Sequence, residues 1–462
     1  MKKKSDFIFA ALCVLVVVGF AWTRITQRQR SKAWEQEKQM RIAKDFRRSY
    51  QEVKDYVATR LPDVTDEQME AWSASNRLEN RMIDGERRYF RNAGPNLFRI
   101  EKELEQDAPE AFEGHIVSDA EVIPLLVEHA YRTGQALGEP RTYQVRYTLT
   151  VDADAVPAGE TVRCWLPFPR ADVPRQRDVQ LLAASEENPV MSGPEFAHST
   201  LYMEKKAVAG EPTVFWEEFR YTALGEWHPL SAKAVKPYDK STRLYKEYTA
   251  ERNTHIRFTP EIRKLMADLA GNETNAYLLA RKFFTYVNDN YPWASALEYS
   301  IQDNIPMYVL KEGHGDCGMV TLLFLTLCRC AGIPARWQSG FMMHPGEWNL
   351  HDWGEVYFEG VGWVPVDMSF GIPSYAVRTA PLMGEWAPHG TPRLSLPEAE
   401  FFYLGGIDPY RMIVNTDYSA ALYPRKRFPR SETVDFQRGE VEWAGGNLYF
   451  DQWDYHMDIT YE

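Results

Sequence analysis

The first part of the chain shows a helical spacing of hydrophobic positions. Apolar residues recur every three or four positions from Trp34 to Leu61, and Pro62 follows, which predicts one long helix that ends there. Thr65, followed by two acidic residues, predicts a second helix start. Further helices are expected over residues 76–90, 97–106 and 118–135. We therefore predict a helical region over residues 27–140.

From residue 141 the hydrophobic period changes from about three and a half to two. Apolar side chains occupy every second position from Tyr143 to Val151. Shorter apolar segments follow around Val162, Leu201 and Phe215, separated by prolines and glycines. Short strands with such turns are typical of a β-sandwich. We predict a β-sandwich domain over residues 141–235.

The helical period returns in the next segment, residues 236–400. Pro260 after Thr259 predicts a helix start, and a second helix is expected over residues 274–290. A third apolar run begins at Cys317 and is closed by Gly332. Asp316, immediately before it, is the expected N-cap. Several helices therefore precede the strands described next.

Two strands joined by a glycine turn follow these helices. Residues 351–358 alternate in polarity, Gly360 and Gly362 form the turn, and residues 363–367 return, which predicts a hairpin. Residues 371–397 are rich in proline and glycine and are expected to form a loop. Alternating apolar patches over 401–462 predict a β-rich extension packed on this core.

Three residues of this segment carry reactive groups in the order thiol, imidazole, carboxylate: Cys317, His351 and Asp367. The thiol lies in a first helical turn, where the helix dipole stabilises a thiolate, although Asp316 opposes this. The hairpin allows Asp367 to accept a hydrogen bond from one imidazole nitrogen and to leave the other facing Cys317. A nucleophile, a base and an orienting carboxylate in this arrangement indicate covalent acyl transfer.

The same stretch resembles the transglutaminase-like family of papain-related cysteine enzymes. The resemblance rests on these segments: Gly315-Asp316-Cys317-Gly318, Leu327-Cys328-Arg329 with Ala331-Gly332-Ile333-Pro334-Ala335-Arg336, His351-Asp352-Trp353-Gly354-Glu355-Val356-Tyr357 and Gly362-Trp363-Val364-Pro365-Val366-Asp367. It implies an α+β papain-like core preceded by a β-sandwich. By resemblance, Cys317 is the nucleophile, His351 the general base and acid, and Asp367 the orienting residue. One departure is Asp352, where a small residue is more usual.

The resemblance also bears on the groups around the nucleophile. Family members place an aromatic residue upstream of the nucleophile to help stabilise the oxyanion, and Trp293 is a candidate for this role or for plain packing. The backbone N–H of Cys317 is the other candidate donor to the oxyanion. His314, His344 and His389 are competing bases. Trp348 and Trp353 are candidates to line a groove for a peptide or glycan.

A zinc site is the rival interpretation of the same reactive residues. It would use Cys317, Cys328, Cys330, His344 and His351, but the two cysteines on one helix lack the spacing of a structural zinc site. We therefore expect no metal and no cofactor. Cys164, Cys328 and Cys330 are expected to be small buried side chains rather than a disulfide framework.

The N-terminus predicts an address outside the cytoplasm. Three lysines precede an apolar run from Phe7 to Trp22, so residues 1–26 are a cleaved signal peptide or a membrane anchor, and both remain open. The body is expected in the periplasm or at the cell surface. A net charge of −12 argues against nucleic-acid binding.

These patterns together predict an exported cysteine enzyme. It would form a thioester at Cys317 from an amide of a peptide or protein, associated with the cell envelope, and water would resolve the thioester. Two alternatives stay open: resolution by a lysine amine, as in a crosslinking transglutaminase, and a non-catalytic surface binding or scaffold module. The oligomeric state is open.

Overall fold

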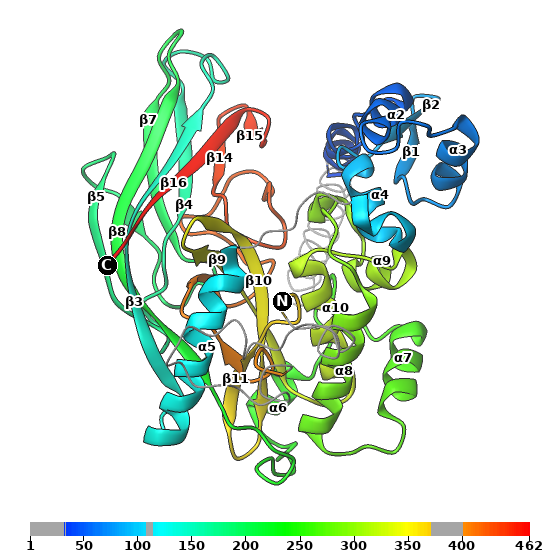
Figure 1. Ribbon diagram of the computed structural model, residues 1–462. Coiled ribbons are helices and arrows are strands. Elements are labelled where there is room, and N and C mark those ends of the chain that lie inside the picture. The colour runs from blue at the N-terminus through cyan, green and yellow to red at the C-terminus, as the bar shows by residue number, and fades with distance from the viewer. Residues whose placement is uncertain (1–31, 33, 108–113, 371–400) are drawn as a thin grey trace, which may run out of the picture. The chain divides into compact units, whose positions relative to one another are not determined.

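The structure is a computed structural model that describes residues 32, 34–107, 114–370 and 401–462 (Figure 1). The described chain forms two compact units, one ending at Pro95 and the other beginning at Asn96. The expected signal or anchor, residues 1–26, lies outside the described residues. Within the described part, no helix combines the length and apolar character needed to cross a membrane.

The first unit contains helices and one small hairpin. A helix covers residues 34–45, and three further elements follow in order: α2 (Tyr50–Ala58), α3 (Asp66–Ala74) and the pair β1 (Asn80–Ile83) and β2 (Glu86–Tyr89). Ser49 and Thr65 cap α2 and α3 with capping boxes. The predicted start at Thr65 is thus confirmed.

Two predictions for this unit are wrong. The single helix from Trp34 to Leu61 is interrupted, because Ser49 starts a new helix and Arg48 pairs through its backbone with Tyr89. The helix over residues 76–90 is a hairpin, because Asp84 and Gly85 take positive φ values of 52° and 83° and form its turn. An Asp-Gly pair is a strong hairpin signal, and it outweighs the helical spacing here.

The second unit opens with helical segments. Helix α4 (Ala93–Ile100) crosses the boundary in sequence, and the 3-10 helix η1 (Lys102–Asp107) follows it. Helix α5 (Gly114–Thr133) packs against the strands β3 (Leu137–Val151) and β8 (Thr213–Trp227). These segments correspond to the helices expected over residues 97–106 and 118–135.

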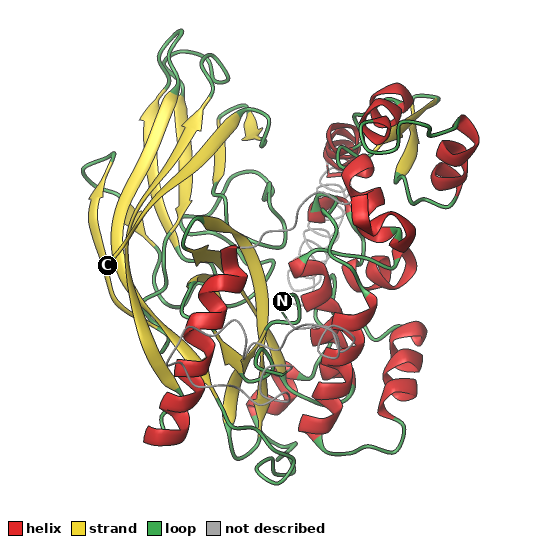
Figure 2. Ribbon diagram, in the orientation of Figure 1, coloured by secondary structure: helices red, strands yellow, loops and turns green. Residues whose placement is uncertain are grey.

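Two five-stranded sheets form the sandwich that the period-two pattern predicts (Figure 2). One sheet has the order β12-β8-β3-β16, with β5 also on β8, and the other has the order β15-β14-β4-β7-β6. The remaining bounds are β4 (Thr161–Pro167), β5 (Gln176–Ala184), β6 (Val190–Met191) and β7 (Thr200–Lys206). Alternate residues of β3 and β8, such as Val145 and Phe219, are buried between the sheets.

The C-terminal strands are shared between two parts of the fold. They are β12 (Gly406–Ile407), β13 (Arg411–Asn415), β14 (Glu440–Trp443), β15 (Gly446–Leu448) and β16 (Trp453–Tyr461). Strand β13 joins the sheet of the core, whereas β14 pairs with β4 and β16 pairs with β3. The predicted β-rich extension over residues 401–462 thus contributes β13 to the core sheet and β14–β16 to the sheets of the sandwich. Strand β16 also contacts the core, since the hydroxyl of Tyr461 donates to the carbonyl oxygen of His344 at 2.9 Å.

The core is a four-stranded antiparallel sheet covered by helices. Its order is β11-β10-β9-β13, from β9 (Ala335–His344), β10 (Glu347–Phe358) and β11 (Gly362–Val366). The helical side holds α6 (Arg243–Tyr248), α7 (Pro260–Ala270), α8 (Ala276–Asn290), η2 (Tyr299–Ile301), α9 (Ile305–Glu312) and α10 (Cys317–Cys330). Helix α10 contacts α7, α8 and α9 as well as β9 and β10. The predicted α+β class is thereby confirmed.

Helix α10 is central to this core because it is apolar on nearly all sides. Leu322, Leu323 and Leu325 are fully buried, and each contributes about 1.5–3 kcal/mol of transfer free energy. Gly354 lets the helix approach β10 closely, since a Cβ there would lie 2.9 Å from the Cδ2 of Leu325. The helix that carries Cys317 is therefore held rigidly against the strand that carries His351.

Candidate active site

Cys317 is the first residue of α10, as the sequence predicts. The side chain of Asp316 accepts a 3.0 Å hydrogen bond from the backbone N–H of Met319, so its predicted role as N-cap is confirmed. The thiol is free and the residue is partly exposed. Position at a helix start, partial exposure and a free thiol are the properties that a nucleophilic cysteine needs.

His351 and Asp367 are brought together by the hairpin. Strands β10 and β11 are antiparallel, with Gly354 opposite Val366. His351 Nε2 lies 2.6 Å from Asp367 Oδ2, and both residues are buried. Burial lowers the pKa of His351, against the opposing effect of Asp367. The imidazole is thus neutral near pH 7, donates its Nε2–H to Asp367 and keeps Nδ1 as a proton acceptor.

Arg411 completes the surroundings of Asp367, and the sequence analysis missed it. Its guanidinium donates one hydrogen bond to Asp367 Oδ2 at 2.8 Å and two to Asp408 Oδ2 at 2.8 and 2.6 Å. Burial alone would raise the pKa of Asp367, but His351 and Arg411 outweigh it, and the pKa lies below its usual value. Asp367 is therefore ionised and stabilises an imidazolium when one forms.

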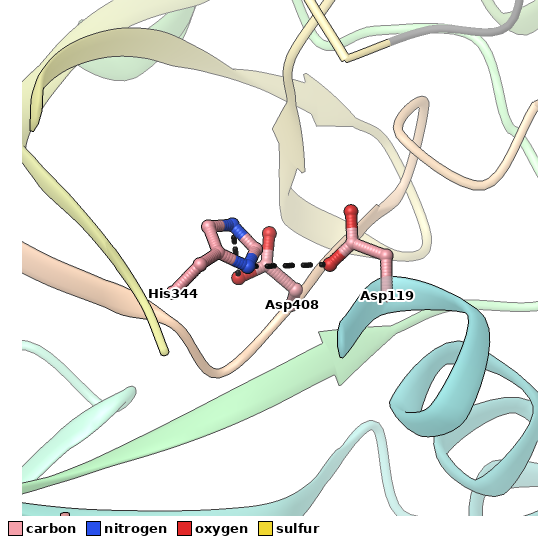
Figure 3. Close-up of side chains that lie close together, drawn as sticks. All are labelled: Asp119, His344 and Asp408. Carbon is pink, nitrogen blue, oxygen red and sulfur yellow. Dashed lines mark ion pairs between the residues drawn. The ribbon is translucent and has the colours of Figure 1, made fainter. Parts of the chain in front are cut away.

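Beyond Arg411 lies a second group of buried polar side chains (Figure 3). The imidazole of His344 has Nδ1 3.8 Å from Asp119 Oδ1 and Nε2 3.9 Å from Asp408 Oδ1. The hydroxyl of Tyr403 donates to Asp119 at 2.5 Å and to Asp408 at 3.1 Å. Hydrogen bonds therefore run from His351 through Arg411 to α5.

Asp119, His344 and Asp408 have donor atoms close enough to hold a metal ion. However, Asp408 Oδ2 already receives Arg411 and Tyr403, and its Oδ1 accepts the backbone N–H of Tyr410 at 2.8 Å. The guanidinium also supplies positive charge where a cation would bind. We therefore interpret this group as a polar support for Asp367.

The thiol itself contacts another carboxyl group. Cys317 Sγ donates to Asp352 Oδ2 at 3.5 Å. Burial raises the pKa of Cys317, and the charges of Asp352 and Asp316 raise it further. Within the described residues, the structure records no hydrogen bond between Cys317 and His351. The structure thus joins His351 to Asp367, and places the thiol against Asp352.

The other candidates from the sequence have varied surroundings. Trp293 forms a β-bridge with Gly315 close to the nucleophile, and its side chain is 44% exposed beneath the guanidinium of Arg99. His314 is buried at the edge of Tyr308. His344 ends β9 and is fully buried. His389 lies outside the described residues.

The expected groove and zinc residues are also separated. Trp353 is fully buried and donates from Nε1 to Gln338 at 2.8 Å, so it lines no surface groove, whereas Trp348 is partly exposed. Among the described residues, Cys164 and Cys328 are buried free thiols and Cys330 is partly exposed. Cys328 and Cys330 belong to the far end of α10 from Cys317. The rival zinc set is therefore not gathered in one place.

Asp408 and Arg411 come from residues 401–462, which were predicted only as a β-rich extension. One signal was present: Arg411 begins an apolar stretch, with the acidic Asp408 three residues before it. A charged residue in a buried strand needs a buried partner. The signal indicates that a partner exists without identifying Asp367.

Comparison with known proteins supports a family for part of the chain. Residues 263–368 match the family model described as the transglutaminase-like superfamily. The uncharacterized protein YebA of Bacillus subtilis (strain 168) is 28% identical over 118 residues, which are 22% of this chain and 15% of YebA. The match thus spans a small part of either protein.

Two solved structures also show similarity. One, from Cytophaga hutchinsonii and named provisionally as a cysteine protease, aligns with a TM-score of 0.41 at 11% identity, over 70% of this chain and 92% of that one. The periplasmic domain of TgpA from Pseudomonas aeruginosa aligns with a TM-score of 0.25 at 14% identity, over 57% and 95%. These values are low, so the assignment rests on the sequence match. Residues 263–368, which include Cys317, His351 and Asp367, are therefore similar in sequence to the transglutaminase-like superfamily.

Proposed function

We propose that this protein is a cysteine amidase or peptidase that acts outside the cytoplasm through a thioester at Cys317. The observation that carries the proposal is the 2.6 Å hydrogen bond between His351 and Asp367, next to a helix that begins with a partly exposed thiol. A buried neutral imidazole held by an ionised carboxylate is the base that such a thiol needs.

The proposed reaction has two halves. In the first, His351 Nδ1 takes the thiol proton, the sulfur attacks the amide carbonyl, and the C–N bond breaks as the amine leaves with that proton. The backbone N–H of Cys317 is a donor for the oxyanion, and Trp293 lies close by. In the second half, His351 accepts a proton from water, the hydroxide adds to the thioester, and the acid leaves as the thiol is reformed.

Asp367 acts through His351 in both halves. Its carboxylate fixes the Nε2–H tautomer and stabilises the imidazolium that forms after each proton transfer. Arg411 and Asp408 keep that carboxylate in place. Substrates are proposed to be amides of peptides or proteins in the cell envelope, and export would depend on residues 1–26.

The experiment is to incubate the full chain with a panel of activated acyl donors and peptide amides, and to quench it for intact-mass analysis. We expect an acyl adduct on Cys317 that hydroxylamine removes, together with release of amine. The variant Cys317→Ala should form no adduct. If wild type and Cys317→Ala show the same adducts and the same amine release across the panel, the proposed amidase or peptidase activity is excluded. The alternative of a non-catalytic binding module would then be favoured.

A second arm separates hydrolysis from transamidation. A fluorescent primary amine is added with the acyl donor, and the products are counted as acid or as amide. Mostly acid supports the hydrolase, whereas mostly amide supports the crosslinking alternative. Protease accessibility of the full chain in intact cells and in spheroplasts tests the proposed address.

A further inference from the structure

Asp352 contacts the thiol that the proposed function uses. Its carboxyl oxygen Oδ2 accepts the S–H of Cys317 at 3.5 Å, while its own backbone N–H also bonds the sulfur. The backbone N–H favours a thiolate and the carboxyl group opposes it. By the resemblance, a small residue is more usual at this position.

A second carboxyl group, that of Asp435, supports Asp352 from the segment between β13 and β14. The two acids are hydrogen bonded to each other, and both are almost fully buried. Ser339 donates to Asp435 at 3.2 Å, and Gln437 Nε2 donates at 2.9 Å to Asp352 Oδ1. Two adjoining buried carboxyls share a proton, because both cannot ionise together.

The position of Asp352 is fixed by tight packing on the side of α10. A Cβ at Gly318 would lie 2.5 Å from Asp352 Oδ2 and 2.3 Å from the hydroxyl of Tyr299. That hydroxyl donates to Asp316 at 2.5 Å. Asp352 therefore has no room to turn away from the sulfur on this side.

The charged and titratable groups around this pair are mainly acidic. Tyr299 belongs to η2, and Asp316 is the N-cap of α10. Asp367 follows β11, and Glu432 lies in the segment before β14. Two cations of this segment are bonded to other groups: Arg438 to Glu432 at 2.9 Å, and Arg430 to Glu440 and to the backbone oxygen of Asp435. Burial and these neighbours raise the pKa of Asp352 and of Asp435. Acidic groups thus surround the thiol, and two of them, Asp352 and Asp435, share one proton.

We propose that Asp352 is a positioning residue that holds Cys317 in the protonated, unreactive state until the sulfur transfers its proton to His351. The inference rests on the proposed function for the role of Cys317 as nucleophile. In the resting site the S–H bond points to Asp352. Before it attacks, the thiol must give up its hydrogen bond to Asp352 and turn towards Nδ1 of His351. A bound substrate acyl group favours this movement by displacing the thiol from the carboxyl group.

The test is the rate of iodoacetamide alkylation of the full chain between pH 5 and 10, with peptides mapped by mass spectrometry. In Asp352→Asn the backbone N–H remains and the carboxyl group that accepts the S–H is gone, so the alkylation midpoint of Cys317 should move to lower pH. A fall of about two units raises the thiolate fraction about 100-fold and reduces its nucleophilicity about eightfold. We expect roughly tenfold faster alkylation at pH 7.

Two further variants check the cause. Asp352→Ser, with the small side chain expected from the resemblance, should also accelerate alkylation, and Asp435→Asn should do so to a smaller extent. Glu217→Gln is the matched control, because Glu217 is a fully buried carboxyl group of the sandwich. It should leave the Cys317 rate unchanged. Buried Cys164 and Cys328 should stay unmodified in every variant, which shows that the fold is intact.

The outcomes separate this inference from the proposed function. Unchanged or slower alkylation in a folded Asp352→Asn would overturn the inference, since Asp352 would then be a bystander or a base for the thiol. If Glu217→Gln accelerated the alkylation of Cys317 equally, the inference would also be overturned, because the effect would then come from a general loosening of the fold. If alkylation accelerates as expected but no acyl donor ever forms an adduct, the proposed function fails while the inference stands.

Discussion

Arg411 donates a 2.8 Å hydrogen bond to the carboxylate of Asp367, and both side chains are buried. The two residues belong to different edges of the core sheet, β13 and the end of β11. The same guanidinium binds Asp408 through two further hydrogen bonds. One cation therefore balances two buried anions, and this balance keeps the orienting carboxylate ionised.

Replacing Arg411 tests this balance. Arg411→Met would leave two carboxylates without their cation, and breaking a buried pair in this way costs about 3–5 kcal/mol. We expect a clearly lower melting temperature, measured by circular dichroism at pH 7. Arg411→Lys keeps the charge but loses the forked geometry of the guanidinium, so its melting temperature should lie between those of wild type and Arg411→Met. Equal melting of Arg411→Met and wild type would contradict this account.

Asp367→Asn tests the orienting role. Asparagine matches the size of aspartate but does not stabilise an imidazolium, and its amide favours the wrong imidazole tautomer. We expect kcat for the best acyl donor to fall about 10⁴-fold, the scale of such a change in another catalytic triad. Asp458→Asn, at an exposed site, is the control and should keep full activity. A loss below tenfold would exclude Asp367 from the proposed mechanism.

Gly340 tests the pairing of β9 with β13. A Cβ there would lie 1.9 Å from the carbonyl oxygen of Met412, a backbone atom that has no room to move. Gly340→Ala should therefore displace β13 and with it Arg411. We expect several kcal/mol of destabilisation in urea unfolding, and loss of acyl-donor activity.

The matched control for that variant is Gly193→Ala. Its Cβ would meet the end of the flexible Glu195 side chain, which can rotate away. We expect little change in either stability or activity. Similar losses in both alanine variants would show that the effect is not specific to the β9–β13 contact.

Asp316 predicts a pH dependence of stability. Burial raises its pKa to about 6 from the usual 3.8, despite hydrogen bonds from Tyr299 and the backbone that lower it. The folded state thus binds the proton more tightly than the unfolded state. The stabilisation is fully present below pH 3.8 and is lost as the pH rises through 6.

Asp316→Asn removes this loss, because the amide has no charge and still caps the helix. Relative to wild type, the variant should gain up to about 3 kcal/mol of unfolding free energy between pH 4 and pH 7. Urea unfolding at both pH values measures the gain, with Asp458→Asn as the control. If the unfolding free energy changed between pH 4 and pH 7 by the same amount in the variant and in wild type, Asp316 would be ionised in the folded state at little cost.

Local patterns were enough to predict much of the core. The cap at Asp316, the helix from Cys317 and the hairpin between His351 and Asp367 depend on residues close together in sequence, and each is present. The family-level assignment followed from the same segment and is confirmed by the match over residues 263–368. The domain boundaries and the catalytic roles stay predictions.

The remaining features depend on distant contacts or on competition between local signals. Nothing near Arg411 in sequence identifies Asp367 as its partner, and nothing near Asp352 identifies Asp435. The hairpin at Asp84 was missed because helical spacing and a turn signal overlapped, and tertiary pairing through Arg48 favours the hairpin. Asp352 stood out in the sequence only as a departure from the family pattern, and its contact with the thiol depends on the distant packing of β10 against α10.

The late position of β13 to β16 has a consequence for biosynthesis. When the ribosome has made α10 and the β10–β11 hairpin, Asp408, Arg411 and Asp435 do not yet exist, so neither His351 nor Cys317 has its buried supports. Strand β16 must also find β3, about 300 residues earlier, and such distant pairing is slow. The site around Cys317 is therefore complete only after the C-terminal strands have paired. A chain that stops before Asp408 is expected to accumulate as an inactive, aggregation-prone species.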